Sequence, residues 1–230
     1  RNAVIEVMQV YCAASATTAA RLAAEFFDGL RVRSVGEKLG AVIITERNPE
    51  ATSDAVRAFI QILVDKMDDD SRLEFIMRCT ERMDYETRMA ANMCMYKNAK
   101  RDPLKPKYAR IPTGDETCAW CLLLASYGFT SRMAEVVKHA HDNCDCRIVV
   151  SWEENPTVSG DEQNQQEYKD LYNEAEKIRT SGEMPKELKM RIDAARSKHK
   201  ANLKSGKVSD KWTTLNELSI IARWLYPGLH

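Results

Sequence analysis

The spacing of apolar residues in the first thirty positions predicts a long amphipathic helix over residues 3–30. Apolar and small side chains recur at intervals of three or four, which places them on one face of a helix. Alanines fill the centre of this segment, and alanine favours helix and allows close packing. Gly29 is expected to end the helix. The expected inward face comprises Val4, Met8, Tyr11, Ser15, Thr18, Leu22 and Phe26.

Two further helices are predicted over residues 54–67 and 71–99. Thr52 or Ser53 is expected to cap the first, because a side-chain oxygen there can accept a hydrogen bond from an unpaired helical N–H. A run of acidic residues before Ser71 suits the start of the second. Between the first two helices, the β-branched run 42–45 predicts a short strand. The expected inward positions are Val56, Phe59, Ile60, Leu63 and Val64, and then Leu73, Ile76, Met77, Met83, Met89, Met93 and Tyr96.

The pattern changes after Arg101. Prolines and a glycine exclude a continuous helix between positions 103 and 114. Alternating and β-branched residues predict strands over 108–111 and 147–152, and an apolar run predicts a short helix over 118–127 that Gly128 ends. Residues 101–152 are therefore expected to form a small α+β unit.

The remainder of the chain is polar and divides by charge. Residues 153–176 carry eight acidic side chains against Lys169 alone, and residues 186–211 carry nine Lys or Arg against three acids. Both stretches are typical of solvated helices or loops, and residues 213–226 predict a last amphipathic helix. The expected fold class is mainly α with a small α+β unit. We expect three regions: 1–100 (N-terminal helical), 101–152 (α+β) and 153–230 (polar, helical).

Composition narrows the function classes. The 230 residues include 34 Lys or Arg and 34 Asp or Glu, so the formal net charge is zero. Nothing in this balance indicates a whole-chain attraction to nucleic acid or to a membrane. No uninterrupted apolar run approaches the roughly 20 residues that span a bilayer, and we expect no membrane partner. The basic stretch Lys186–Lys211 could contact DNA phosphates, but pairing with the acidic stretch before it is favoured.

The strongest chemical signal is a cluster of cysteines and a histidine. Cys118 and Cys121 are separated by two residues, and His141, Cys144 and Cys146 follow close together. A Cys-x2-Cys turn lets two thiolates reach one ion, and cysteines two apart in an extended chain project to the same side. Five such donors are available for a tetrahedral site that needs four. The pattern therefore predicts a structural Zn²⁺ site.

Some alternatives remain open for these residues. Which four of the five donors bind is undetermined, and His141 is either a ligand or a neighbour of the metal. His139 is a less favoured candidate ligand than His141. Unmetallated thiols or two disulfides are the competing interpretation. The other cysteines, Cys12, Cys79 and Cys94, fall in helical patterns and are expected to be small buried apolar residues.

No catalytic arrangement is expected. A redox Cys-x2-Cys would follow a strand, and a zinc deaminase would place His-x-Glu before its cysteines; neither order occurs. The chain also lacks Gly-x-Ser-x-Gly, a phosphate-binding loop and His-Glu-x2-His. An enzyme that uses Arg110 with a carboxylate is the weakest option, because a surface ion pair better explains that arginine. We expect no enzymatic activity.

Several segments together carry a resemblance to a known family. They are Arg101-Asp102-Pro103, the run Ala109–Gly114, the run Thr117–Ser126 and the run His139–Cys146. The chain resembles tailed-phage minor capsid proteins related to the minor head protein F of phage Mu, in the form found in actinobacterial phages and prophages. The hallmark His-x2-Cys-x-Cys ending matches His141, Cys144 and Cys146. The first helix is similar as well, and the likeness spans residues 3–176.

The resemblance implies a structural role. Such proteins are present in few copies inside the phage head near the portal, and they act in head assembly, DNA packaging or delivery. Portal and capsid proteins are the implied partners, together with other copies of the chain. The implied location is the capsid interior of the virion, or the bacterial host cytoplasm during assembly. Residues 130–133 lack the Tyr-Arg-Ser usual in the family, which puts that loop alone in doubt.

Overall fold

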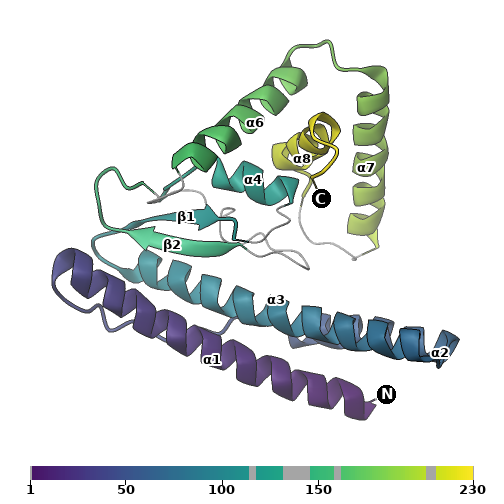
Figure 1. The fold of residues 1–230 in the computed structure, drawn as a ribbon, viewed down its shortest axis with the longest axis horizontal. Helices are drawn as coiled ribbons and strands as arrows, with labels where there is room; N and C mark the ends of the chain where they lie inside the picture. The colour runs from purple at the N-terminus through teal and green to yellow at the C-terminus, as the bar shows by residue number, and fades with distance from the viewer. Residues whose placement is uncertain (1, 114–117, 132–145, 158–161, 206–210, 230) are drawn as a thin grey trace. The chain divides into compact units, whose positions relative to one another are not determined.

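The computed structural model describes residues 2–113, 118–131, 146–157, 162–205 and 211–229. Within these residues the chain forms helices and a two-stranded antiparallel sheet, so the mainly helical class is confirmed (Figure 1). The elements are α1 (Asn2–Val35), α2 (Pro49–Asp65), α3 (Asp69–Arg101), β1 (Lys107–Ile111), α4 (Ala119–Ala125), β2 (Arg147–Ser151), α6 (Glu162–Thr180), α7 (Lys186–Lys204) and α8 (Thr214–Leu225).

The chain divides into two compact units, and each is described by itself. The first unit contains Arg1–Ile111 and Phe129–Pro156, and the second contains Pro112–Gly128 and Thr157–His230. The first holds α1 to α3 and both strands, and the second holds α4 and α6 to α8. The expected regions 1–100, 101–152 and 153–230 remain a prediction.

In the first unit, α1 and α3 run side by side in the same direction (Figure 1). Small residues make this close approach possible: Cys12, Ala16, Ala20, Ala23 and Ala24 are all buried on α1. The expected inward face of α1 is wrong for its large members, since Tyr11, Leu22 and Phe26 are each more than half exposed. The buried stripe lies one position further along, because alanine side chains let two helix backbones approach and larger ones hold them apart.

The first helix also continues past its expected end. Gly29 lies inside α1, and the helix ends at Val35. Gly36 follows with a φ of +88°, a left-handed conformation that glycine adopts without a steric penalty. Its N–H donates to the Val32 carbonyl at 2.9 Å, which satisfies one of the last helical carbonyls.

The segment between α1 and α2 is extended but is not a strand, so the strand expected over 42–45 is wrong. Asn98 of α3 takes the place of a neighbouring strand. Its Oδ1 accepts from the Val42 N–H and its Nδ2 donates to the Val42 carbonyl, both at 2.9 Å. A side-chain amide presents the same donor and acceptor as a peptide group, so it can hold an extended segment without a ladder.

Side-chain caps define the starts of α2 and α3. Asn48 accepts a hydrogen bond from the Ala51 N–H at 3.0 Å, and Pro49 occupies the first helical position. The expected cap at Thr52 or Ser53 is therefore wrong by about one turn. Asp68 caps α3 by accepting from the Ser71 N–H at 2.8 Å, as the acidic run indicated.

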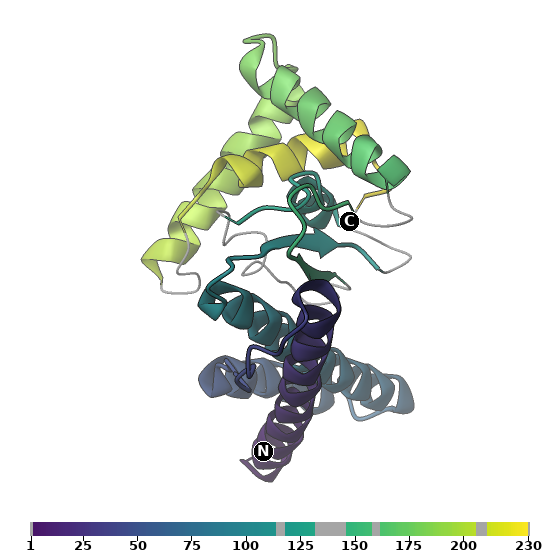
Figure 2. The same cartoon turned by 90° about the vertical axis from the view of Figure 1, so that its left-hand side faces the viewer.

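The two strands form a ribbon at the C-terminal end of α1 and α3 (Figures 1 and 2). β1 and β2 pair antiparallel with Tyr108 opposite Val150, close to the predicted bounds. Asn92 of α3 ties β2 to the helix: its Nδ2 donates to the Cys146 carbonyl at 3.0 Å, and its Oδ1 accepts from the Ile148 N–H at 2.9 Å.

The second unit is built around the last helix. Leu218 and Ile221 of α8 are fully buried with Leu123 and Leu124 of α4 and Leu188 of α7. The predicted amphipathic helix over 213–226 is therefore confirmed, and its apolar face packs inside its own unit. The acidic and basic stretches supply α6 and α7, and both are helical as expected.

Among the described helices, α1 has the length and the composition to cross a membrane. In its apolar 18-residue stretch, 17% of the residues are buried. The core helix of a folded protein and a signal sequence meet the same test, and α1 packs against α3 in the first unit.

Candidate metal centre

Cys118 and Cys121 lie at the start of α4 in the second unit. Cys118 is the N-cap residue, with a half-buried side chain, and Cys121 is 2% exposed. The Cys121 N–H donates to the Cys118 sulfur at 3.3 Å. This contact closes the Cys-x2-Cys turn and directs a backbone donor at one sulfur, which suits a thiolate because it stabilises negative charge there.

The other candidate donors follow in the chain. Cys146 belongs to the first unit, directly before β2, and is 4% exposed. The hydrogen bond from Asn92 to its carbonyl sets its backbone position. His141 and Cys144, and also His139, lie outside the described residues. The structure thus describes three of the five donors and brings Cys118 and Cys121 together.

No group of three or more His, Cys, Asp or Glu side chains that could hold a metal occurs within the described ranges. Two of the five predicted donors fall outside those ranges. The zinc site therefore remains a prediction from the sequence, and the turn at Cys118 fits its chemistry.

The three remaining cysteines differ in exposure. Cys12 and Cys94 are fully buried, as predicted, and burial raises the pKa of both thiols. The Cys94 sulfur donates to the Ala20 carbonyl at 3.2 Å, across the α1–α3 interface. Cys79 is only partly buried, so that part of the prediction is wrong. Burial still raises the pKa of the Cys79 thiol to about 11, which leaves little thiolate at neutral pH.

Arg110 does not occupy the surface position that was expected. It lies on β1 and is 1% exposed, among the largest fully buried side chains of the described chain. Its neighbours on β1, Tyr108 and Ile111, are buried as well. Arg110 is therefore a buried residue and not part of a surface ion pair.

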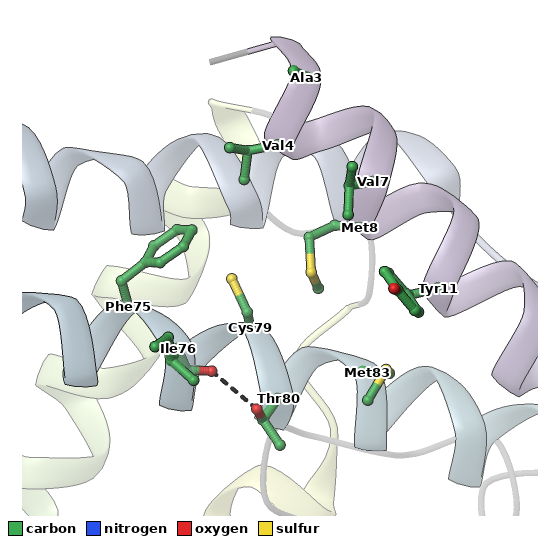
Figure 3. Close-up of a pocket in the computed structure, with 10 residues that line it drawn as sticks. All are labelled: Ala3, Val4, Val7, Met8, Tyr11, Phe75, Ile76, Cys79, Thr80 and Met83. Atoms are coloured by element: carbon green, nitrogen blue, oxygen red, sulfur yellow. Dashed lines mark hydrogen bonds between the residues drawn. The ribbon is translucent and has the colours of Figure 1, made fainter.

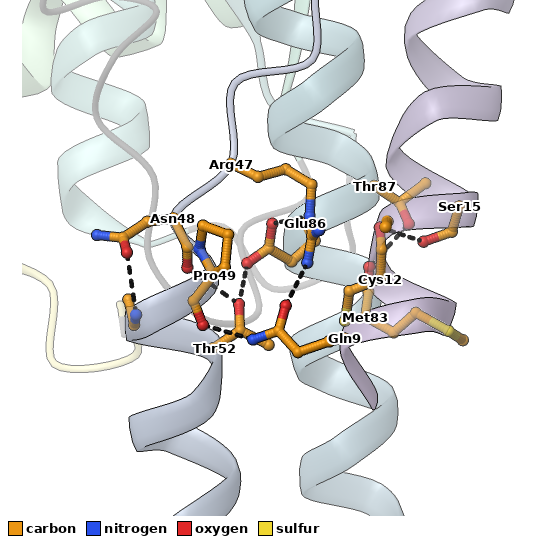
Figure 4. A network of polar contacts seen from close by, with 12 residues as sticks. Gln9, Cys12, Ser15, Arg47, Asn48, Pro49, Thr52, Met83, Glu86 and Thr87 are labelled. Atoms are coloured by element: carbon orange, nitrogen blue, oxygen red, sulfur yellow. Dashed lines mark hydrogen bonds and ion pairs between the residues drawn. The ribbon is translucent and has the colours of Figure 1, made fainter. Parts of the chain in front are cut away.

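Sequence reasoning missed a buried ionic network in the helical bundle (Figure 4). Glu86 of α3 is 3% exposed and forms ion pairs with Arg47 at 3.2 Å and Arg82 at 2.6 Å. It also accepts a hydrogen bond from the Thr52 hydroxyl of α2, and Arg47 donates to the Gln9 amide oxygen of α1. One carboxylate thus connects α1, α2 and α3. The sequence pattern gives no signal for this buried network, because Glu86 is one of many charged residues on α3.

The model of the VG15 protein family matches residues 1–175. A search of curated proteins finds no match, and a search of solved structures finds none either. The matched range includes α1 to α3, both strands and all five candidate zinc donors. Because the match covers well over half of the chain, the protein belongs to the VG15 family of phage proteins.

Proposed function

We propose that this phage protein is a minor capsid protein, a structural component of the head that acts near the portal in head assembly and DNA packaging or delivery. The observation that carries the proposal is the phage family match over residues 1–175, which contains the Cys/His motif on which the resemblance to minor head proteins rests. The proposed role is structural and not enzymatic. The proposed location is the capsid interior, or the host cytoplasm during assembly.

The first unit has surfaces suited to protein partners. Large apolar side chains are exposed on α1, where Val10 is 67% and Phe26 54% exposed, and on α3, where Ile76 is 58% exposed. Exposed apolar residues that gather on one element mark interaction sites more often than scattered ones do. Portal and capsid proteins are the proposed partners, with a second copy of this chain as a further candidate.

The test uses phage particles. The gene is deleted and purified particles are compared with wild type by mass spectrometry, DNA content and infectivity. We expect the protein in wild-type virions at few copies per portal, and deletion should give heads with defective packaging or delivery. Expression of the wild-type chain in trans should restore infectivity. A protein absent from both virions and assembling heads, with normal particles after deletion, would refute the proposal.

We propose in addition that four of Cys118, Cys121, His141, Cys144 and Cys146 bind a structural Zn²⁺. The spacing of the donors supports this, together with the amide that donates to the Cys118 sulfur. When bound, the ion would add its binding free energy to the stability of the folded chain.

Elemental analysis of the purified protein tests the zinc proposal. We expect about one zinc per chain and a large drop in melting temperature on chelation. Cys144→Ser should lose most of the metal, whereas Cys79→Ser, outside the donor set, should keep it. Absence of metal in the wild-type chain, with reactive thiols or disulfides at the four paired cysteines, would show that the site is not a zinc site.

A second candidate function is nucleic-acid binding through Lys186–Lys211. The observation that favours it is the exposure of the lysines on α7, among them Lys189, Lys198 and Lys200. The arginines of α7 pair with Glu187 at 2.7 Å and with Glu217, neither of which belongs to the acidic stretch 153–176. DNA affinity that falls steeply with salt, and a slope that decreases when these lysines are changed to glutamine, would support this function.

A further inference from the structure

One face of α1 carries large apolar side chains that the first unit leaves uncovered. It is the face that the spacing of apolar residues predicts as inward, yet Tyr11, Leu22 and Phe26 on it are 60%, 58% and 54% exposed. The helix packs against α3 through small residues on a different face. We call the uncovered face the α1 stripe. Its members are Val4, Met8, Tyr11, Ser15, Thr18, Leu22 and Phe26.

The N-terminal half of the α1 stripe is hollow, because it borders an open apolar pocket (Figure 3). Val4, Met8 and Tyr11 line this pocket from α1, and Phe75 and Ile76 are among the residues that line it from α3. The pocket has a volume of about 510 Å³, which is within the range of cavities that take up ligands. Apolar side chains from outside the unit can therefore enter at this end of the stripe.

The C-terminal half of the α1 stripe projects into solvent instead. Leu22 and Phe26 are about one helical turn apart, and each leaves more than half of its side chain exposed. These two residues follow Ser15 by seven and eleven positions, and Met8 and Val4 precede Ser15 by the same seven and eleven positions. One helix face thus carries a hollow and two projecting side chains at equal distances from Ser15.

The centre of the α1 stripe is small and is already satisfied in its hydrogen bonding. Ser15 and Thr18 are its smallest members, so a second helix can come close to the backbone here. The Ser15 hydroxyl donates to the Cys12 carbonyl of its own helix at 3.3 Å. Covering Ser15 therefore leaves no unpaired hydroxyl donor, which removes the usual cost of burying a polar group.

Charge permits a second copy on this face and favours one orientation of it. The charged residues of α1 between positions 4 and 26 are Glu6, Arg21 and Glu25, and none belongs to the stripe. At about 100° per residue, Glu25 is the nearest of them and borders the stripe. Two parallel copies would bring their Glu25 carboxylates together, whereas two antiparallel copies place each Glu25 near the start of the other helix. The antiparallel pair thus avoids this repulsion.

We infer that the α1 stripe binds the same stripe of a second copy of this chain, with the two helices antiparallel and a two-fold axis at Ser15. Leu22 and Phe26 of each copy then enter the pocket beside Met8 and Val4 of the other. Because each contact occurs twice, the interface closes on itself as an isologous dimer. The inference goes beyond the proposed head function, since it rests on α1 and its pocket alone. Its failure would leave the particle experiments unaffected.

The size of the stripe sets the expected affinity. Residues 4–26 of a helix extend over about 33 Å. Tyr11 and Phe26 leave roughly 200 Å² uncovered per copy, because a large aromatic side chain can bury about 150–250 Å². With symmetry and the aliphatic members included, the interface comes near the total of about 1,000 Å² at which specific interfaces begin. We therefore expect a weak dimer, with a dissociation constant of about 1–100 μM.

Sedimentation velocity of the full chain between about 2 and 200 μM tests the inference, and we expect a monomer–dimer equilibrium in this range. Leu22→Glu should raise the dissociation constant by about tenfold or more, because it places a charge in the pocket of the other copy. Leu22 is exposed, so the variant should fold, which circular dichroism checks. The matched control is Val10→Glu on the same helix, because Val10 is 67% exposed and lies about 120° from the centre of the stripe. This control should dimerise like the wild-type chain.

Cross-linking through introduced cysteines tests the antiparallel geometry. Under oxidation by copper phenanthroline, Ser15→Cys should give a disulfide between two copies, since the two thiols meet at the axis. Val4→Cys should not, because its two thiols lie about 33 Å apart in the antiparallel pair. Peptide mass spectrometry distinguishes these links from links between native cysteines.

Several results would overturn the inference. The first is a chain that stays monomeric at about 200 μM, well above the expected dissociation constant. Another is a dimer that Leu22→Glu leaves intact, and a third is a Val4→Cys link that forms as readily as the Ser15→Cys link. Binding of a monomeric chain to vesicles of phosphatidylglycerol and phosphatidylcholine, abolished by Leu22→Glu, would assign the stripe to a membrane instead.

Discussion

Arg31 of α1 and Asp102 after α3 form a buried ion pair across 71 residues of chain, with 2.7 Å between Nε and Oδ2. Their side chains are 3% and 0% exposed. Asp102 also accepts from the Leu104 N–H and the Trp152 indole N–H, each at 2.9 Å. Arg31 donates in addition to the Glu37 carbonyl at 2.9 Å. The pair thus connects the end of α1, the end of α3 and the segment after β2.

Removal of the carboxylate should destabilise the first unit strongly. We expect Asp102→Ala to lower the free energy of unfolding by about 3 kcal/mol, because it leaves a buried guanidinium and an indole N–H without their acceptor. Urea unfolding followed by circular dichroism measures the change. Glu37→Gln is the control, since Glu37 is 76% exposed, and its effect should stay below about 0.5 kcal/mol. Similar losses for both variants would contradict the assignment.

The same pair predicts how stability depends on pH. Burial alone would raise the pKa of Asp102, but hydrogen bonds from Arg31, Leu104 and Trp152 outweigh it and hold the pKa below its ordinary value. A carboxyl with a depressed folded-state pKa contributes stability above its unfolded pKa of about 3.9 and loses it as pH falls through the folded value. We therefore expect stability to fall in acid, and we expect a shallower fall in Asp102→Asn. Identical acid profiles would show that Asp102 does not contribute.

Helices and strands with a strong periodic signal were predictable from the sequence. The apolar stripe of α8, the β-branched run of β2 and the acidic start of α3 each follow from local chemistry, and the structure confirms them. The end of α1 was not predictable in the same way. Both Gly29 and Gly36 are able to end a helix, and only the chain geometry after Val35 selects the second.

The periodicity of apolar residues does not predict which segments far apart in the sequence contact each other. The run 42–45 has the composition of a strand, yet it lies against Asn98 and not against another strand. Which face of α1 is buried depends on the distance between α1 and α3. That distance is set by the alanines of α1 together with the residues of α3 that they contact. For the proposed zinc site, the candidate donors come from the sequence alone, and the structure adds the turn at Cys118 and Cys121.

The network around Glu86 gives a third prediction. Glu86→Gln keeps the shape of the side chain but removes the charge that faces Arg47 and Arg82, and it should cost about 3 kcal/mol of unfolding free energy. The matched control is Asp84→Asn two residues earlier on α3, whose carboxylate is 57% exposed and pairs with Arg88 at 3.5 Å. We expect less than about 0.5 kcal/mol there, measured by urea unfolding. If Asp84→Asn lowered the free energy of unfolding as much as Glu86→Gln does, burial of the Glu86 network would not explain its contribution to stability.

Cys79 should react slowly although its side chain is only partly buried. With a pKa of about 11, the thiol is almost entirely protonated at pH 8, and the thiolate is the reactive form. Alkylation by iodoacetamide, followed by peptide mass spectrometry, should be about tenfold slower at Cys79 in the folded chain than in urea, because the lower thiolate fraction outweighs the higher nucleophilicity of that thiolate. Equal rates in the two states would show that the thiol is not desolvated.

Asn98 offers the most local test of the fold. Asn98→Leu keeps the branched outline of the side chain, although leucine is larger, and it removes the partner of the Val42 N–H and carbonyl. An unpaired peptide group costs about 1–3 kcal/mol when it is buried, but Val42 is 45% exposed and its carbonyl still accepts from the Cys94 sulfur at 3.5 Å, so we expect a loss of about 1–2 kcal/mol. Hydrogen exchange distinguishes this from general destabilisation. The Val42 amide should lose protection at once, whereas amides in the centre of α3 should exchange only in proportion to the global loss. If hydrogen exchange instead became faster uniformly along the chain, the hydrogen bonds between Asn98 and Val42 would not be what holds residues 41–46 in place.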